Sequence, residues 1–291
     1  MPKFEYVKPS SVGEAVKLLQ EKGENALVMA GGTAVVLLLQ RRFLRPELVI
    51  DLGGISGLNR IEPDGNALYV GALTPIRSIE KDRSVHLMHG LLAEAAGQVA
   101  NVRIRNAATI GGSVCFGEPQ TDIPPALIAM RAIAILSGPN GERKIPVEEF
   151  FLGPYETRRS EYELLTHLYI PPTDLLSGGC HMKFTLGSPE NKPVVNVSVL
   201  VNTDESRETL INARIVMGAV GGTPILAEKA SAALSGERWR DSLIDQVAHM
   251  ASEEADPIQD LRGSAWYKRR VTKRLVEKAL WCAIGRVNSK L

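Results

Sequence analysis

The sequence predicts an α+β fold in two domains, and three observations support this prediction. Strand-like and helix-like runs alternate over residues 11–52, as in a small α/β unit. Pro171 and Pro172 then interrupt the pattern and mark a domain boundary. After them come strand-like runs and then helix-like runs, the order typical of an antiparallel sheet covered by helices.

The first elements are defined by their end signals. Ser11 followed by Glu14 forms a capping box, which predicts a helix to about Lys22 with Gly23 as its stop. The inner face of this helix comprises Val12, Ala15, Leu18 and Leu19. The elements expected next are a strand at 26–30, a helix at 34–42 and a strand at 47–52.

From about Asn59 the pattern changes. We expect strands at 67–72, 132–138 and 162–170 and helices at 91–100 and 124–130. Beyond the prolines we expect strands at 180–187, 194–202 and 209–219 and helices at 224–235, 239–254 and 264–284. Val195, Val197, Val199 and Val201 alternate with other residues, which predicts an antiparallel sheet with one buried face.

Composition excludes several classes of function. The 291 residues are 44% apolar and 23% charged, which is ordinary for a globular protein. A net charge of +1 provides no general attraction for nucleic acid or an anionic membrane. The N-terminal residues lack a secretory pattern, and no run of about 18 apolar residues could span a bilayer. We therefore expect a cytoplasmic protein without a membrane span.

Cysteine and histidine spacing predicts no metal site on this chain. Cys115, Cys180 and Cys282 show no CxxC pattern, so they are expected to be small buried apolar residues. The five histidines include no HExxH motif and are read as structural or solvated.

Two glycine pairs are the strongest candidates for ligand binding. Gly31, Gly32 and Thr33 form a turn between a predicted strand and a predicted helix, where open amides and the absence of a Cβ favour an anion. Gly111 and Gly112 follow a second strand-like run, with hydroxyl donors beside them. Such turns are also common without a ligand, and spacing alone does not show that the two segments meet.

Three motifs in fixed order carry a family resemblance: AGGT, IRNAATIGG with Asp122 beyond it, and DLRGSAWYKRR. With these the chain resembles the FAD-binding medium subunits of molybdenum hydroxylases, the group of xanthine dehydrogenase and aerobic carbon monoxide dehydrogenase. The resemblance covers nearly all of the chain. It implies a two-lobed FAD-binding domain of the vanillyl-alcohol-oxidase (PCMH) type over 1–172, with lobes of about 1–57 and 58–172. It also implies a C-terminal α+β domain of the carbon monoxide dehydrogenase flavoprotein type over 173–291.

The resemblance also implies flavin contacts at particular positions. The first segment would contribute Val28, Met29, Ala30, Gly31, Gly32, Thr33, Ala34 and Val35. The second segment would contribute Ala108, Thr109, Gly112 and Ser113, with Val99 and Ala100 before it and Thr121 and Asp122 after it. More distant contacts would be Leu165 and Lys183.

Asp122 has a specific expected role. Its carboxylate can accept hydrogen bonds from a ribityl or ribose hydroxyl. The alternative is that it caps a helix that begins at Pro124.

The sequence departs from its relatives at several positions. Ala34 stands where many relatives have an acidic residue, and Ser113 stands where asparagine is usual. Over 187–197 many relatives carry an arginine followed by an aspartate, and this chain has Ser188 and Pro193 near those positions. The contact of the second domain with the flavin or with the electron acceptor is therefore open. The chain also lacks the cysteine-rich insertion that holds a four-iron cluster in one subclass.

The implied function is an electron relay. A large subunit would carry the molybdenum–pterin cofactor and a small subunit two 2Fe-2S clusters, in a heterotrimer or a dimer of heterotrimers. Electrons would pass to FAD on this chain and then to an external acceptor. No side chain here is expected to act as a catalytic acid, base or nucleophile.

Other readings stay open at this point. One is a free-standing flavin oxidase or dehydrogenase, and another is a non-catalytic nucleotide-binding module. The basic run 268–274 reads as a solvated helix face opposite Val271, Leu275, Ala279 and Cys282, with subunit docking as its alternative.

Overall fold

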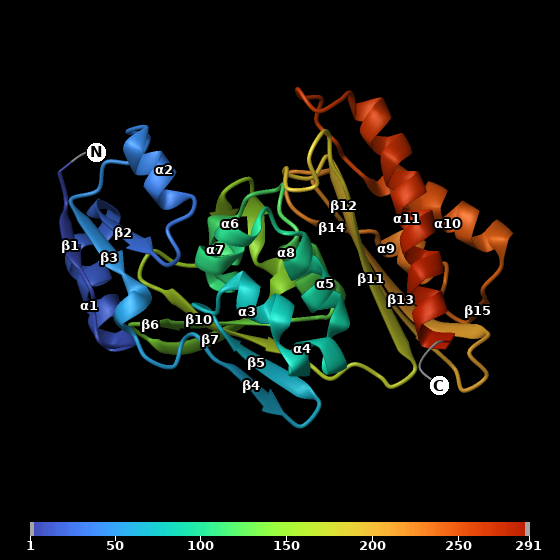
Figure 1. Cartoon of the computed structure of the whole chain (residues 1–291), viewed down its shortest axis with the longest axis horizontal. Helices are drawn as coiled ribbons and strands as arrows, with labels where there is room; N and C mark the ends of the chain where they lie inside the picture. Colours follow the sequence, from blue (N-terminus) through green and yellow to red (C-terminus); the bar gives the residue numbers. More distant parts are fainter. Residues whose placement is uncertain (1–2, 289–291) are drawn as a thin grey trace.

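The computed structural model describes residues 3–288 and arranges them around three main sheets that follow one another along the molecule (Figure 1). Each sheet has its own apolar core cluster. No helix among the described residues is long and apolar enough to cross a bilayer. Within residues 3–288 no group of three or more His, Cys, Asp or Glu side chains could hold a metal ion.

The N-terminal unit is a small parallel sheet in the order β1-β3-β2, flanked by helices. Its elements are β1 (Glu5–Val7), α1 (Val12–Lys22), η1 (Gly23–Asn25), β2 (Ala26–Met29), α2 (Val35–Gln40), β3 (Leu48–Asp51) and η2 (Leu52–Gly54). The predicted helix start is confirmed, because the Ser11 side chain accepts from the Glu14 amide at 3.2 Å. The Glu14 carboxylate, however, accepts from Ser10. Strand β1 was not predicted.

The second unit is an antiparallel sheet in the order β4-β5-β10-β6-β7, with helices packed on one face (Figure 1). Its strands are β4 (Ile61–Asp64), β5 (Ala67–Gly71), β6 (Ile133–Gly138), β7 (Gly141–Pro146) and β10 (Leu164–Ile170), with a separate hairpin of β8 (Phe151–Gly153) and β9 (Glu156–Thr157) after η3 (Val147–Glu149). Its helices are α3 (Ile76–Lys81), α4 (Arg83–Met88), α5 (Gly90–Gln98), α6 (Val102–Ala107), α7 (Ile110–Phe116) and α8 (Ile123–Ala129).

The strand-like reading before the second glycine pair was wrong. Residues 102–107 form α6, and the glycines lie in the first turn of α7. Two side chains explain both helices, since Asn101 accepts from the Ile104 amide and Thr109 accepts from the Gly112 amide.

The C-terminal unit is an antiparallel sheet in the order β11-β12-β13-β14, with β15 paired to β13. Its strands are β11 (Ser177–Phe184), β12 (Val195–Thr203), β13 (Thr209–Gly218), β14 (Ile225–Leu226) and β15 (Glu237–Arg238). Its helices are α9 (Glu228–Ala232), α10 (Asp241–Glu254) and α11 (Ala265–Asn288). The predicted helix at 224–235 was therefore too long, because its first residues pair with β13.

The prediction of one buried face for the last sheet was also wrong. The valines of β12 pack under α10 and α11, but Asn196 and Ser198 on the opposite face are fully buried too. Helices α5 and α8 of the preceding unit cover that face. Asn196 and Ser198 thus meet the neighbouring unit and not solvent.

The reading of 268–274 as a uniformly solvated basic face needs one correction. Lys268 is only 2% exposed and lies on the inner side of α11. Arg269, Arg270 and Arg274 are exposed as expected.

Candidate functional site

The first glycine turn presents open amides between β2 and α2. Gly32 has a φ of +68°, a conformation that a side chain would strain. Among the hydrogen bonds of residues 3–288, the amides of Gly32, Thr33 and Ala34 have no acceptor. A turn of this kind can donate several hydrogen bonds to one anion without a lysine.

The two glycine segments meet in the fold. A Cβ on Gly31 would lie 1.8 Å from the carbonyl oxygen of Ala107 and 3.2 Å from Cα of Ala108. A Cβ on Gly112 would lie 4.0 Å from Cβ of Ala30. Glycine at position 31 is therefore required by the close approach of another backbone, and this approach places the end of α6 against the first turn.

The second segment contributes differently from the first. Its amides are already used: Gly111 donates to Ala72, Gly112 to Thr109 Oγ1 and Ser113 to the Thr109 carbonyl. A Cβ on Gly111 would also lie 2.5 Å from Cβ of Ala72. The open amides are thus confined to the first turn, and the hydroxyls of Thr109 and Ser113 are the donors that the second segment offers.

A cavity of about 410 Å³ opens between the second and C-terminal units. The start of α6, the end of α5 and the segment after β11 line it, through Gln98, Ala100, Asn101, Arg105, Lys183, Thr185 and Glu190 among others. Helix α6 therefore joins the two parts of the site, because one end lines the cavity and the other contacts the first glycine turn.

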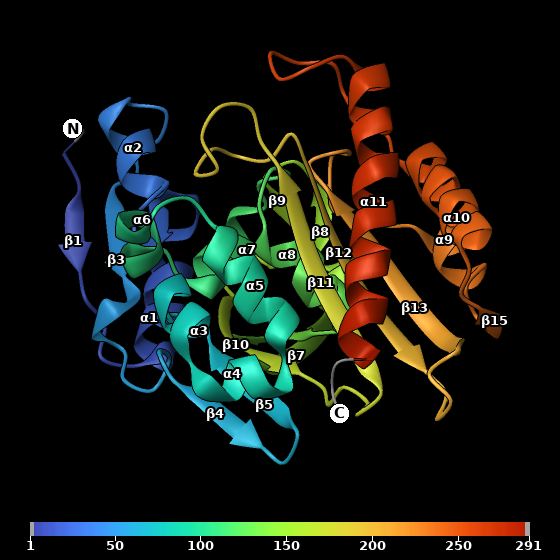
Figure 2. The ribbon, with the colours of Figure 1, turned by 45° about the vertical axis from the view of Figure 1, so that its right-hand side comes forward.

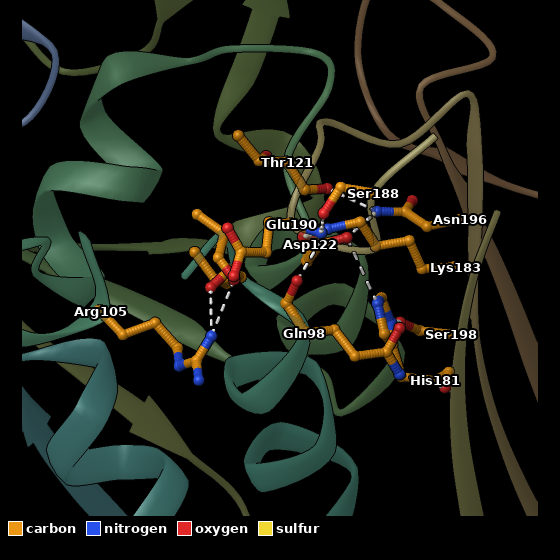
Figure 3. Close-up of polar contacts among 12 residues, drawn as sticks. Gln98, Arg105, Thr121, Asp122, His181, Lys183, Ser188, Glu190, Asn196 and Ser198 are labelled. Carbon is orange, nitrogen blue, oxygen red and sulfur yellow. Dashed lines mark hydrogen bonds and ion pairs between the residues drawn. The ribbon is translucent and has the colours of Figure 1, made fainter. Parts of the chain in front are cut away.

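Arg105 fixes the wall of this cavity at Val99 and Ala100. Its guanidinium donates to both carbonyl oxygens at 2.8 Å (Figure 3). It also donates to Glu80 Oε2 at 2.8 Å. Ala100 has a φ of +39°, a conformation that non-glycine residues rarely adopt, and the Arg105 contacts hold it.

Asp122 lies at the junction of the two units and is fully engaged there. Its Oδ2 accepts from Lys183 Nζ at 2.9 Å, and its Oδ1 accepts from Asn196 Nδ2 at 2.9 Å (Figure 3). Burial by itself would raise the pKa of Asp122, but His181, Lys183 and Asn196 together hold that pKa below its usual value. Asp122 does occupy the N-cap position of α8, which begins at Ile123, but its side chain makes no capping hydrogen bond, so the capping role was wrong.

His181 and Gln98 complete this junction. His181 Nδ1 lies 2.8 Å from Ser198 Oγ, while its buried Nε2 lies 3.6 Å from Asp122 Oδ1. The side-chain amide of Gln98 donates to the His181 backbone carbonyl. The backbone carbonyl of Gln98 accepts from Lys183 Nζ at 2.7 Å. Sequence reasoning missed His181 and Asn196, since no local motif distinguishes them. It also missed Arg105, although this residue lies in the IRNAATIGG motif.

The remaining candidates lie at different distances from the cavity. Thr121 precedes Asp122, and its carbonyl accepts from Asn196 Nδ2 at 2.8 Å. Leu165 is buried on β10, a strand that contacts α7, and it belongs to the core of the second unit. Over 187–197 two residues contact the second unit: Lys192 pairs with the buried Glu118, and Asn196 donates to Thr121 and Asp122.

Comparison with known proteins identifies the family. Residues 2–173 match the family described as "FAD binding domain in molybdopterin dehydrogenase", and residues 190–283 match the "CO dehydrogenase flavoprotein C-terminal domain". The chain belongs to the FAD-binding medium subunits of molybdopterin dehydrogenases. Medium subunits of this family are parts of molybdenum-containing dehydrogenase complexes, which are oxidoreductases, and the predicted α+β fold is confirmed.

Individual medium subunits match over almost their full length. The carbon monoxide dehydrogenase medium chain of Hydrogenophaga pseudoflava is 33% identical, with 98% of each chain covered. The glyceraldehyde dehydrogenase medium chain of Sulfolobus acidocaldarius is 30% identical, with 96% of this chain and 97% of that one covered. The solved structure of carbon monoxide dehydrogenase from Hydrogenophaga pseudoflava superimposes with a TM-score of 0.95 at 34% identity, covering 98% of each chain.

Proposed function

We propose that this medium subunit binds FAD across the two glycine segments and relays electrons from iron–sulfur clusters of a partner subunit to an external acceptor. The observation that carries this proposal is the contact of Gly31 with Ala107 and Ala108. It brings the open amides of the first turn to one end of α6, the helix whose other end lines the cavity. FAD supplies a carrier that takes electrons singly and releases them singly or in pairs.

The residues have separate roles in this proposal. The amides of Gly32, Thr33 and Ala34 and the hydroxyls of Thr109 and Ser113 bind the diphosphate. The cavity beside Arg105 and Lys183 holds the flavin ring, and Ala100 lines it. Arg105 also binds the Val99 carbonyl, while Leu165 supports the site only from the core of the second unit. Asp122 is itself buried and acts through Lys183, which it orients and which lines the cavity.

The proposal includes the rest of the assembly. A large subunit with a molybdenum–pterin cofactor and a small subunit with two 2Fe-2S clusters complete a heterotrimer, and the small subunit is the electron donor. The domains are proposed as 1–172 and 173–291, with lobes 1–57 and 58–172. Supporting this, the first sheet ends before residue 57 and β11 starts at Ser177.

An absorption spectrum of the purified chain tests FAD binding. We expect flavin bands after FAD is added and gel filtration removes the excess. Gly32→Val should abolish these bands, because a β-branched residue is strained at a φ of +68° and would crowd the diphosphate. Gly57→Val is a matched control, since Gly57 has a φ of +88° and nothing lies within 4 Å of its Cβ position. A wild-type chain that retains no flavin would contradict the proposal.

A further inference from the structure

The turn before α11 and the start of that helix expose large apolar side chains. Leu261 is 105% exposed, Ile258 is 69% exposed and Trp266 is 66% exposed, and all three lie within nine residues. We call Ile258, Leu261 and Trp266 the apolar knob. Single exposed apolar residues are ordinary, but a cluster of this kind on one turn is typical of an interaction site.

A buried lysine holds the knob rigid. Lys268 Nζ donates to the Ile258 carbonyl at 2.8 Å and pairs with Asp260 Oδ1 at 2.9 Å. Asp260 and Gly263 exchange both of their backbone hydrogen bonds. Burying an ammonium group is costly unless its hydrogen-bond acceptors are well placed. The turn that supplies these acceptors to Lys268 is therefore ordered before another protein binds. Preorganisation of this kind lowers the entropic cost of binding.

The knob also lies beside the proposed flavin cavity. Gln120, two residues before Asp122, donates to Asp260 Oδ2 at 3.4 Å. The Tyr267 ring meets the edge of Phe184, whose neighbours Lys183 and Thr185 line the cavity. Figures 1 and 2 both place the turn before α11 next to the segment that joins β11 and β12.

The rim of the knob is basic. Arg262 follows Leu261, and the Arg270 guanidinium lies 5.0 Å from the centre of the Trp266 ring. Arg269 is exposed beside them. The turn also contains two carboxylates: Asp260 pairs with Lys268 and with Arg262, and Asp256 is exposed two residues before Ile258. An apolar centre with an arginine rim fits a partner with an apolar hollow among acidic side chains.

We propose that the apolar knob docks the electron-donating iron–sulfur subunit. This inference rests on the proposed function. Electron tunnelling falls steeply with distance, so the donor must contact the chain close to the flavin, and the knob is a rigid surface at that place. Its basic rim predicts an acidic contact face on the donor.

Variants in the co-expressed complex test this docking surface. We expect Leu261→Asp to weaken retention of the iron–sulfur subunit by about 30-fold or more, as at an interface hot spot, with FAD content per chain unchanged. Leu175→Asp is the control, because Leu175 is 85% exposed in the segment between β10 and β11. Retention is measured by gel filtration and by iron per flavin, so a misfolded variant is recognised by its loss of FAD.

A charge variant keeps the test independent of apolar contacts. Arg262→Glu with Arg270→Glu should slow association and reverse its salt dependence, so that added salt helps binding. Stoichiometric iron–sulfur subunit on Leu261→Asp, or selective loss of only the large subunit, would overturn the inference and leave the proposed function intact. If no iron–sulfur subunit accompanies even the wild-type chain, both are overturned.

Discussion

At the scale of single residues, Gly31 shows how one missing Cβ joins two distant segments. A side chain there would meet the Ala107 carbonyl oxygen at 1.8 Å, and a backbone atom cannot rotate away. We expect Gly31→Ala to destabilise the fold by about 1–3 kcal/mol through overpacking and to lower FAD affinity, because the segments separate. Thermal unfolding and FAD titration measure the two effects.

A matched control is available on α1. Gly13 lies in the helix with nothing within 4 Å of its Cβ position, so Gly13→Ala should stabilise the chain by about 0.5–1 kcal/mol. Equal effects of the two substitutions would show that the approach of Gly31 to α6 is unimportant.

Asp122 is the second residue with a clear expected effect. Asp122→Asn leaves the Lys183 ammonium buried without its carboxylate, which typically costs about 3–5 kcal/mol. Adding Lys183→Met to Asp122→Asn should recover part of this loss. Urea unfolding of the wild type, the two single variants and the double variant gives the coupling energy. Asp245→Asn, at an exposed pair with Lys273, should change stability by less than about 0.5 kcal/mol.

The pH dependence of this pair has a definite sign. The pKa of Asp122 is lowered in the folded chain, so its contribution is present above the usual carboxylate pKa of 3.8. The contribution disappears as pH falls below that value through the folded pKa. If Asp122→Asn unfolded with the wild-type acid profile, the carboxylate would not be the stabilising charge.

At the scale of elements, the junction of α4 and α5 contains a histidine that titrates on unfolding. His89 is 2% exposed, and burial lowers its pKa from 6.5 to about 4. The unfolded chain therefore binds a proton more readily between these values, and stability falls as pH drops from 6.5 towards 4. At pH 5 the loss is about 2 kcal/mol by linkage.

His89→Gln removes this titration. Its unfolding free energy should change less than that of the wild type between pH 7 and pH 5, in a series of urea melts. His86→Gln on α4 is the control, because His86 is exposed. Parallel pH profiles for wild type and His89→Gln would contradict the assignment.

Sequence patterns predicted most elements, but not how they use their polar residues. Helix α6 was missed because its β-branched residues suggested a strand, although Asn101 supplied an N-cap signal. The alternation in β12 was read correctly for the valines and wrongly for Asn196 and Ser198, since a polar face looks the same whether solvent or another domain covers it. The contact of Gly31 with α6 depends on tertiary packing, which spacing along the chain does not encode.

At the scale of the whole molecule, α11 is tied across the junction to α5. Arg286 donates to both carboxylate oxygens of Glu94, at 2.7 and 2.9 Å, and to the Gly179 carbonyl at 2.6 Å. Glu94 also accepts from the His181 amide at 2.9 Å. A bidentate pair that shares its carboxylate with the neighbouring backbone fixes orientation as well as distance. The cavity lies across the same junction, so this pair also holds its two walls together.

We expect Arg286→Met to uncouple the two domains. Losing this charged network should cost about 2 kcal/mol, so calorimetry should show a lower first transition separated from a second one. FAD affinity should fall as well, because one wall of the cavity becomes mobile. Arg274→Met removes an exposed pair with Glu277 on the same helix and should leave a single transition. A single, unshifted transition for Arg286→Met would mean that the apolar contacts of α5 and α8 with the last sheet are sufficient to couple the domains.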